Sequence, residues 1–276
     1  MSSTATSRPP LRSLDEVHEP AVRAAVDALI AHPATLGFTF CGSRAAGFAT
    51  PEADYDGFAY VTREHYRSLD VEATQVLIFA EEGDTPKRVI GDFSLFSDDV
   101  LTEALHSPLD IDHWPWVDAV IVADRDGALA AWRDRLAAFP EERRKERAIH
   151  RFIQLVIALH YAISDDVRGF EMDRQINLHR AALAAVHLWF TLRGRWAPPL
   201  KWLTREIDRL EIRPDTRAVL EGAVLNPTIE MLTHVRDHMK SDMRHSGITE
   251  VDNLRREFFK TLTPERRPAI YRDSYL

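Results

Sequence analysis

The pattern of apolar residues changes near Pro140, and this change limits the folds that the chain can adopt. Before Pro140, short apolar runs are separated by turn-forming segments; after it, apolar residues recur with the 3.6-residue period of helices. The change predicts an α+β domain over residues 14–140 and an all-helical domain over residues 141–276. Residues 1–13 lack the apolar core of a secretory signal and are predicted to form a disordered leader.

The individual elements are predicted from the same patterns. In the first domain we expect a helix over 14–31, a helix after residue 127, and strands over 36–41, 57–61, 75–80 and 88–96. The stretch 116–127 is expected to form one more strand that ends in a turn. In the second domain we expect helices over 141–164, 172–193, 199–211, 215–225, 228–243 and 249–261.

Composition narrows the classes of partner. The net charge of −8 argues against a nucleic-acid backbone as the main ligand.

The single cysteine, Cys41, excludes an internal disulfide and a cysteine-based zinc cluster, which suits a reducing cytoplasm. Cys41 lies in an apolar run and is expected to be a small buried residue. Because no apolar run reaches the length of a membrane span, we expect a cytoplasmic protein with no membrane partner. The oligomeric state is not predicted.

The stretch from 36 to 61 carries the first chemical signal. An apolar run ends in Gly42-Ser43, a second glycine follows at Gly47, and Asp54 and Asp56 precede the next apolar run. Glycine lets a ligand approach the backbone, and Ser43 is expected to cap a short helix. Acids two residues apart on a strand share a face at roughly 6.5 Å and repel each other by roughly 2–3 kcal/mol. A divalent cation such as Mg²⁺ would remove that repulsion.

A third acid, Asp92, lies inside a later strand-like run. Carboxylates within apolar β-rich segments usually have a partner or a metal ion, and three of them on neighbouring strands could hold two metal ions. The plainer alternative is that Asp54 starts a turn and that Asp92 faces solvent. Only the strand pattern selects Asp92 over the acids near it in the sequence, which are Glu81, Glu82, Asp84, Asp98 and Asp99.

These residues resemble a known signature. GSRAAG followed by D-Y-D, with a later third acid, resembles the nucleotidyltransferase superfamily that includes DNA polymerase beta and the aminoglycoside nucleotidyltransferases. The resemblance implies a small mixed sheet flanked by helices, and transfer of a nucleotidyl group, AMP from ATP, to a hydroxyl. It implies two Mg²⁺ ions on Asp54, Asp56 and Asp92, with Asp92 also near the acceptor hydroxyl as ligand, general base or both. It places the nucleotide on Gly42, Ser43, Arg44 and Gly47.

The helical half adds to the resemblance. The segment WAPPLKWL at 196–203 is similar to bacterial small-molecule adenylyltransferases, in which a lysine contacts the nucleotide phosphates. This implies a phosphate contact for Lys201; the alternative is a surface lysine beside Trp202. A group of acids, expected in a loop between two helices, could attract a cationic acceptor such as an aminoglycoside, but a solvated loop is the simpler explanation: Asp165, Asp166, Glu171 and Asp173.

Other functions stay open. The acceptor could be a hydroxyl of a protein rather than of a small molecule, or the chain could be a non-catalytic nucleotide-binding regulator. An RNA-cleaving helical domain with an Arg-x4–6-His motif fits Arg174 and His179, but several other Arg–His pairs show the same spacing by chance. The sequence lacks HExxH, GxSxG and GxGxxG, which argues against metalloproteases, serine hydrolases and Rossmann enzymes.

Overall fold

The computed structural model describes residues 9–80, 88–210 and 214–262. The chain divides into two compact units. The sheet unit contains the described residues up to Ser107 together with Ile111–Ala138, and the helical unit contains Pro108–Asp110 together with the described residues from Phe139 onward. The chain therefore enters the helical unit briefly at Pro108–Asp110, returns to the sheet unit, and leaves it again after Ala138.

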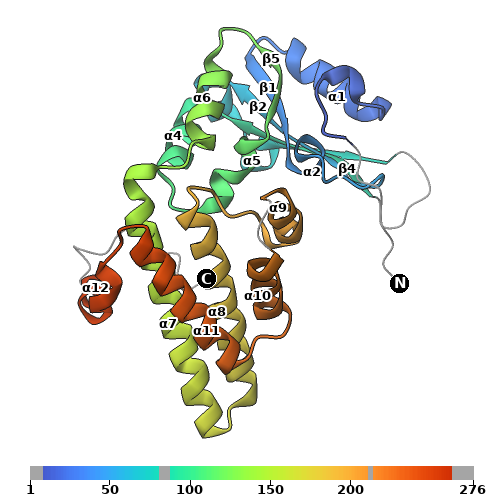
Figure 1. The fold of residues 1–276 in the computed structure, drawn as a ribbon. Helices are drawn as coiled ribbons and strands as arrows, with labels where there is room; N and C mark the ends of the chain where they lie inside the picture. The colour runs from blue at the N-terminus through green and yellow to red at the C-terminus, as the bar shows by residue number, and fades with distance from the viewer. Residues whose placement is uncertain (1–8, 81–87, 211–213, 263–276) are drawn as a thin grey trace. The chain divides into compact units, whose positions relative to one another are not determined.

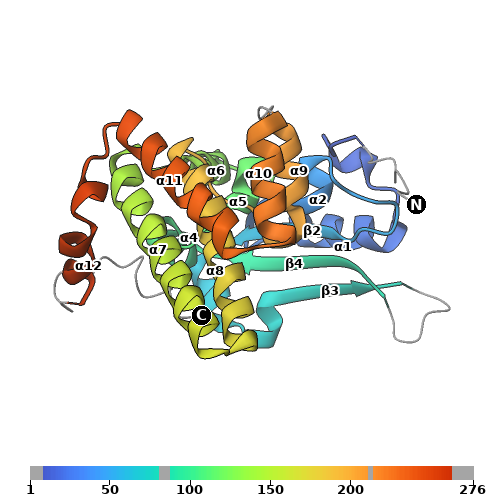
Figure 2. The same cartoon turned by 60° about the horizontal axis from the view of Figure 1, so that its bottom comes forward.

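Within the described residues, the sheet unit is built on a five-stranded mixed sheet with the order β3-β4-β2-β1-β5 (Figure 1). The strands are β1 (Thr35–Cys41), β2 (Tyr55–Val61), β3 (Gln75–Phe79), β4 (Val89–Phe96) and β5 (Val120–Asp124). β1 pairs antiparallel with β2 and β5, β2 pairs parallel with β4, and β3 pairs antiparallel with β4. In the described part of the chain β3 is an edge strand, and Figure 2 shows it lying beside β4. The predicted α+β class is confirmed.

The helices of the sheet unit are mostly short. They are α1 (Pro20–Ala31), α2 (Gly42–Ala46), α3 (Arg63–Ser68), α4 (Asp98–His106), α5 (Trp114–Val117) and α6 (Ala128–Ala137). Single 3₁₀ turns cover Leu14–Glu16, Val71–Thr74 and Asp110–Asp112. α1 begins at Pro20, a position where the missing N–H of proline removes no helical hydrogen bond.

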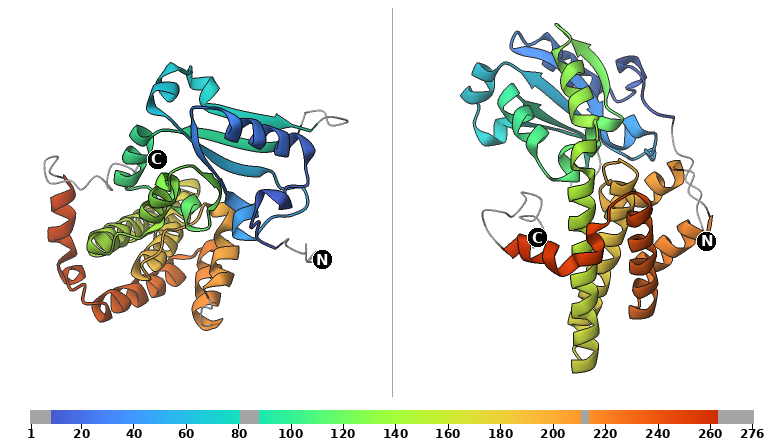
Figure 3. Two further views of the ribbon diagram at one scale, coloured as in Figure 1. Left: turned by 90° about the horizontal axis from the view of Figure 1, so that it is seen from above. Right: turned by 60° about the vertical axis from the view of Figure 1, so that its left-hand side comes forward.

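Each face of the sheet has its own apolar cluster. On one face, Ala59 and other strand residues pack against Val22 and Val26 of α1, which crosses the sheet in the left view of Figure 3. On the other face, Phe58 and Tyr60 pack with residues of α4, α5 and α6. Because side chains alternate along a strand, Asp56 lies on the same face of β2 as Phe58 and Tyr60. The sheet unit thus places its acids on the face that α4–α6 cover.

The helical unit contains α7 (Arg144–Arg168), α8 (Glu171–Leu192), α9 (Leu203–Arg209), α10 (Pro214–Leu225), α11 (Ile229–His245) and α12 (Leu254–Leu262). Short 3₁₀ turns cover Glu141–Arg143, Leu200–Trp202 and Glu250–Asn253. α7 ends at Gly169, whose φ of 73° is the left-handed conformation that closes many helices, and α8 follows directly to form the hairpin seen in the right view of Figure 3. Buried alanines line the core between α7 and α8, which allows close helix packing: Ala158, Ala162, Ala181, Ala182 and Ala185.

A buried ionic cluster ties the segment 108–110 into the helical unit. Arg147 of α7 donates to the Pro108 carbonyl at 2.8 Å and to Asp110 Oδ1 at 2.7 Å, and its guanidinium lies 4.7 Å from the centre of the Trp196 ring. Arg151 donates to Asp110 Oδ2 at 2.9 Å, and His187 Nδ1 lies 3.5 Å from the same oxygen. Burial would raise the pKa of Asp110, but His187 and the two guanidinium groups outweigh it and hold that pKa below its ordinary value.

Two predictions need correction. Residues 9–13 do not belong to a disordered leader: Leu11 is 5% exposed in the sheet-unit core, and its N–H donates to the Arg44 carbonyl. Residues 1–8 lie outside the described residues. The strand predicted to start at residue 116 and to end in a turn by 127 starts too early. Pro115 lies in the first turn of α5, whose Trp116 packs against Phe58 and Phe96 of the sheet, and β5 covers only Val120–Asp124.

α3 and α4 have no counterpart among the predicted elements. The apolar residues of α4 are few, and its single buried residue, Leu101, gives little periodic signal. Among the described helices, none combines the length and apolar character that crossing a membrane requires.

Candidate functional site

Two of the predicted acids lie in one row across the sheet. Cys41 is the Cα partner of Asp56 in β1–β2, and Asp56 is the Cα partner of Asp92 in β2–β4. Residues paired in this way point to the same face, and neighbouring strands are about 4.7–4.9 Å apart. The register therefore brings Asp56 and Asp92 side by side although β3 separates their strands in the sequence. Asp54 immediately precedes β2, two residues before Asp56.

The Cys41 thiol is buried in a negatively charged part of the sheet unit. Cys41 is 3% exposed and free, as expected for a small core residue. Burial raises the pKa of its thiol well above the usual value, and the charges of Asp56, Asp92 and Asp54 each raise it further. A buried thiol with a raised pKa is a poor nucleophile, which agrees with the expected core role of Cys41.

Two features of the structure require a glycine at position 42. Its φ of 65° is a left-handed conformation, and a Cβ on it would lie 2.1 Å from Oδ2 of Asp56. The absence of a side chain at Gly42 thus lets the Asp56 carboxylate lie directly against the turn. Ser43 does not cap the following helix as expected; it is the second residue of α2, and the N-cap position is Cys41.

We expect Gly42→Ala to weaken the predicted Mg²⁺-dependent binding of ATP by at least about tenfold, because the new Cβ must displace the Asp56 carboxylate. The left-handed backbone adds a strain of about 1–2 kcal/mol. Isothermal titration calorimetry measures the first effect and urea unfolding the second. Gly127→Ala is the matched control: Gly127 has a φ of 77° but open space around its Cβ position. Similar losses of ATP binding in both variants would contradict the steric explanation.

Arg44 holds the backbone that leads to Asp54. Its Nε donates to the carbonyls of Ala53 and Asp54, both at 3.1 Å, and its Nη2 donates to Ala53 as well. The guanidinium lies 3.9 Å from the centre of the Tyr55 ring. Arg44 was predicted to bind the nucleotide; the structure gives it a role in positioning the loop before β2, and a direct nucleotide contact stays a prediction.

Gly47 has a packing role in the structure. It ends α2 with a φ of 79°, and a Cβ on it would lie 2.8 Å from Cγ of Pro10. The predicted contact of Gly47 with the nucleotide also stays a prediction.

Asp92 accepts a hydrogen bond from Nε2 of Gln75 in β3 at 2.9 Å. Two other acids near it in the sequence have partners of their own. Asp98 accepts hydrogen bonds from Tyr60 and Trp132, and Asp99 forms ion pairs with Arg63 and Arg67. The remaining acids considered, Glu81, Glu82 and Asp84, lie outside the described residues. Sequence reasoning missed Gln75, because a glutamine at the start of the apolar run QVLIF gives no signal that it faces an acid on another strand.

The three acids do not form a finished metal centre. In the part of the chain that the structure describes, no three His, Cys, Asp or Glu side chains are grouped so as to hold a metal ion. Asp54, Asp56 and Asp92 are each only partly exposed. Asp56 and Asp92 are neighbours in the row, Asp54 precedes them on the chain, and their carboxylates would have to converge on a cation.

The remaining residues singled out from the sequence belong to the helical unit. Lys201 is exposed, and its Nζ lies 5.4 Å from the centre of the Trp202 ring. This is the position expected of a surface lysine beside Trp202, and the contact of Lys201 with nucleotide phosphates stays a prediction. The acids predicted to share a loop lie instead within helices, Asp165 and Asp166 in α7 and Glu171 and Asp173 in α8, with only Gly169 and Phe170 between these helices. Three of them have partners: Asn177 donates to Asp165, and Arg174 pairs with Asp166 and Glu171.

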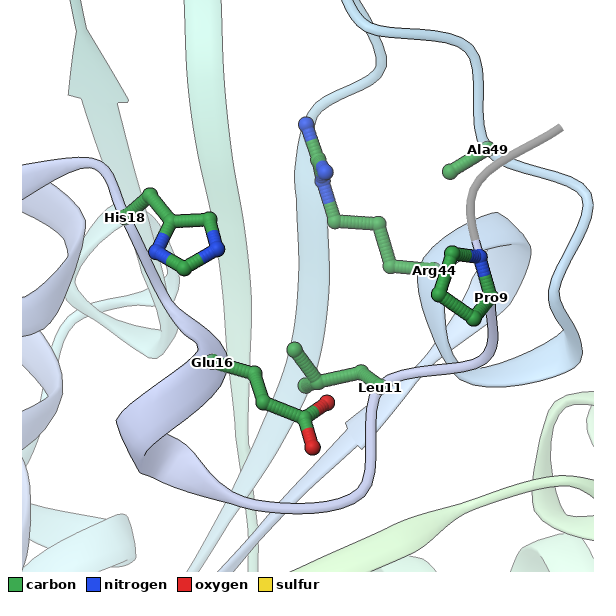
Figure 4. A pocket seen from close by; sticks show the side chains of 6 residues that line it. All are labelled: Pro9, Leu11, Glu16, His18, Arg44 and Ala49. Atoms are coloured by element: carbon green, nitrogen blue, oxygen red, sulfur yellow. The ribbon is translucent and has the colours of Figure 1, made fainter. Parts of the chain in front are cut away.

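A hollow of about 400 Å³ lies elsewhere in the sheet unit (Figure 4). It is lined by Pro9, Leu11, Glu16, His18, Arg44 and Ala49. Of the predicted site residues only Arg44 lines it, and the guanidinium of Arg44 is already engaged with the loop before β2. We therefore regard the carboxylate row, and not this hollow, as the candidate active site.

Comparisons with known proteins give limited further information. A family model described as a domain of unknown function, DUF4037, matches residues 115–203. That segment contains Lys201 but none of Asp54, Asp56 and Asp92. A nucleotidyltransferase-like protein from Exiguobacterium sibiricum 255-15 is similar in structure, with a TM-score of 0.48 and 19% sequence identity over 86% of this chain and 79% of that chain. No curated protein matches the sequence.

Proposed function

We propose that this protein transfers a nucleotidyl group, AMP from ATP, to a hydroxyl of an acceptor in a Mg²⁺-dependent reaction at Asp54, Asp56 and Asp92. The observation that carries the proposal is the register that places Asp56 beside Asp92, with the Asp56 carboxylate against Gly42 and Asp54 two residues before Asp56. Neighbouring carboxylates on one face of a sheet repel each other, and their convergence on a cation would relieve that repulsion.

The donor set fits magnesium. Carboxylate oxygens are the protein ligands that Mg²⁺ prefers, and Asp54, which directly precedes β2, is two residues before Asp56 of that strand. Mg²⁺ bound there, as one or two ions, would neutralise the triphosphate and the charge that develops on the leaving pyrophosphate. Asp54 and Asp56 would hold the ions, Arg44 would fix the backbone carbonyl of Asp54, and Gly42 would keep space for Asp56.

Asp92 would act at the acceptor. The acceptor oxygen forms a bond to the α-phosphorus, the bond from that phosphorus to the pyrophosphate oxygen breaks, and Asp92 takes the proton that the hydroxyl loses. Gln75 would orient Asp92 through its hydrogen bond. Asp92 is partly exposed, so a hydroxyl can reach it.

A pyrophosphate-release screen tests the proposal. The protein is incubated with Mg²⁺, each nucleoside triphosphate in turn, and aminoglycoside, lincosamide and protein acceptors. Acceptor-dependent release that disappears in Asp92→Asn would support transfer and would separate small-molecule from protein acceptors. Mg²⁺-dependent binding of ATP without release on any acceptor would favour a nucleotide-binding regulator instead.

We expect Lys201→Ala to weaken binding of ATP more than binding of AMP, because a lysine on the outer phosphates contributes only when those phosphates are present. Titration calorimetry with both nucleotides measures the difference. Lys240→Ala, which removes a partly exposed lysine paired with Asp252 in the same unit, serves as the control. Equal losses for ATP and AMP would make Lys201 a surface residue beside Trp202.

A further inference from the structure

The edge strand β3 continues the carboxylate row. Leu77 of β3 is the Cα partner of Asp92 of β4, so the row runs through Cys41, Asp56, Asp92 and Leu77 across four neighbouring strands. Cβ atoms of directly opposed residues are about 4.5–5.5 Å apart, which puts the Leu77 side chain within contact distance of Asp92.

The exposed face of β3 is apolar next to Asp92. Exposure alternates along the strand: Gln75, Leu77 and Phe79 are exposed, whereas Val76 and Ile78 pack into the core on the other face. Leu77 is 42% exposed and Phe79 is 43% exposed. A single exposed leucine is ordinary, but two large apolar side chains on one face beside a carboxylate form a surface that a ligand can cover.

Phe79 extends this surface along the sheet. β3 pairs with β4 from Gln75 opposite Ser94 to Phe79 opposite Val89, and Gly91 of β4 is the partner of Tyr55. Phe79 thus lies toward the end of β4 that neighbours Asp54, whereas Gln75 lies toward the opposite end. Leu77 and Phe79 together flank the acids on the side of Asp92.

From this arrangement we infer that the acceptor of the proposed reaction carries an apolar ring or aliphatic face next to the hydroxyl that reacts, and that Leu77 and Phe79 bind that face. The inference rests on the proposed function, in which Asp92 receives the proton of the acceptor. An acceptor hydroxyl at Asp92 places the adjoining atoms of the acceptor over Leu77 and Phe79. β3 contributes the amide of Gln75 and the apolar side chains of Leu77 and Phe79 to this surface, and these two side chains favour an acceptor with an apolar face over a polycation such as an aminoglycoside.

The test compares small alcohols as probes. Protein with Mg²⁺ and a non-hydrolysable ATP analogue is titrated with 2-phenylethanol, with 2-cyclohexylethanol, and with 2-(2-aminoethoxy)ethanol, a cationic alcohol of similar length, and binding is followed by saturation-transfer NMR. We expect the two apolar alcohols to bind about fivefold tighter than the amino alcohol, as covering roughly 40 Å² of apolar surface would give. Leu77→Ser with Phe79→Ser should remove this preference. Val117→Ser, which changes an apolar residue of the same unit that is 46% exposed, should keep it.

The outcomes separate this inference from the proposed function. Equal or tighter binding of the amino alcohol, an unchanged preference in the double variant, or no binding of any probe would overturn the inference if the ATP analogue still binds with Mg²⁺. Failure of the ATP analogue to show Mg²⁺-dependent binding to the unmodified protein would instead overturn the proposed function. Far-UV circular dichroism of each variant confirms that the exposed substitutions leave the fold intact.

Discussion

Replacing Asp54 and Asp56 together by asparagine is expected to abolish Mg²⁺-dependent binding of ATP. Asparagine keeps the shape of each side chain but removes the negative charge, and a neutral amide oxygen is a much weaker partner for a divalent cation. Both acids are partly exposed, and their mutual repulsion opposes folding, so the variant should fold at least as well as the original protein. Titration calorimetry with ATP in Mg²⁺ measures binding directly, and thermal unfolding checks the fold.

The control removes the same charge from elsewhere in the sheet unit. Asp70→Asn with Glu72→Gln takes two negative charges from exposed positions next to β3, and should leave ATP binding unchanged. If the original protein binds ATP as tightly in EDTA as in Mg²⁺, the metal-dependent proposal is wrong. If the control loses binding as completely as the Asp54–Asp56 variant, the effect reports net charge rather than a site.

Arg147→Ala is expected to lower the free energy of unfolding of the helical unit by about 3–5 kcal/mol, the usual effect of removing one partner of a buried ion pair. The Arg147 side chain is 1% exposed and that of Asp110 is 7% exposed. Alanine would remove the hydrogen bonds to Asp110 and to the Pro108 carbonyl and the contact with Trp196, and would leave a cavity. Urea unfolding followed by far-UV circular dichroism measures the change.

Two further variants sharpen this measurement. Arg236→Ala in α11 removes a partly exposed arginine paired with Asp237, and a surface pair of this kind contributes about 0–1 kcal/mol. Arg147→Lys keeps the charge but loses the forked donors and the stacking surface, so its loss should be intermediate. A loss under about 1 kcal/mol for Arg147→Ala would show that water or neighbouring groups solvate Asp110 as well as the arginine does.

The sequence predicted the location of most elements because their apolar periodicity is strong. α7 and α8 are long and amphipathic, and β1 and β4 are rich in apolar and aromatic residues, so the predicted ranges lie close to the observed ones. The prediction was wrong where a local pattern was ambiguous. In the segment from Trp116 to Val122 an apolar run could be helix or strand, and Pro115 decides for a helical turn that periodicity alone does not detect.

The candidate site was less predictable than the fold. The spacing of Asp54 and Asp56 predicted that they share a face, because side chains alternate along a strand. That Asp92 neighbours Asp56 depends on the strand order, in which β4 inserts between β2 and β3, and no local pattern encodes this order. The hydrogen bond from Gln75 and the position of Leu77 follow from the same long-range register.

The way in which Arg44 holds its loop determines what kind of change the loop can tolerate. Arg44 binds carbonyl groups of the main chain at Ala53 and Asp54, which every amino acid possesses. Substitutions at Glu52 or Ala53 should therefore be accepted readily, since the groups that Arg44 recognises remain. Insertion or deletion of one residue between Gly47 and Asp54 would move those carbonyls out of reach. In this part of the molecule, the number of residues is under stronger constraint than their identity.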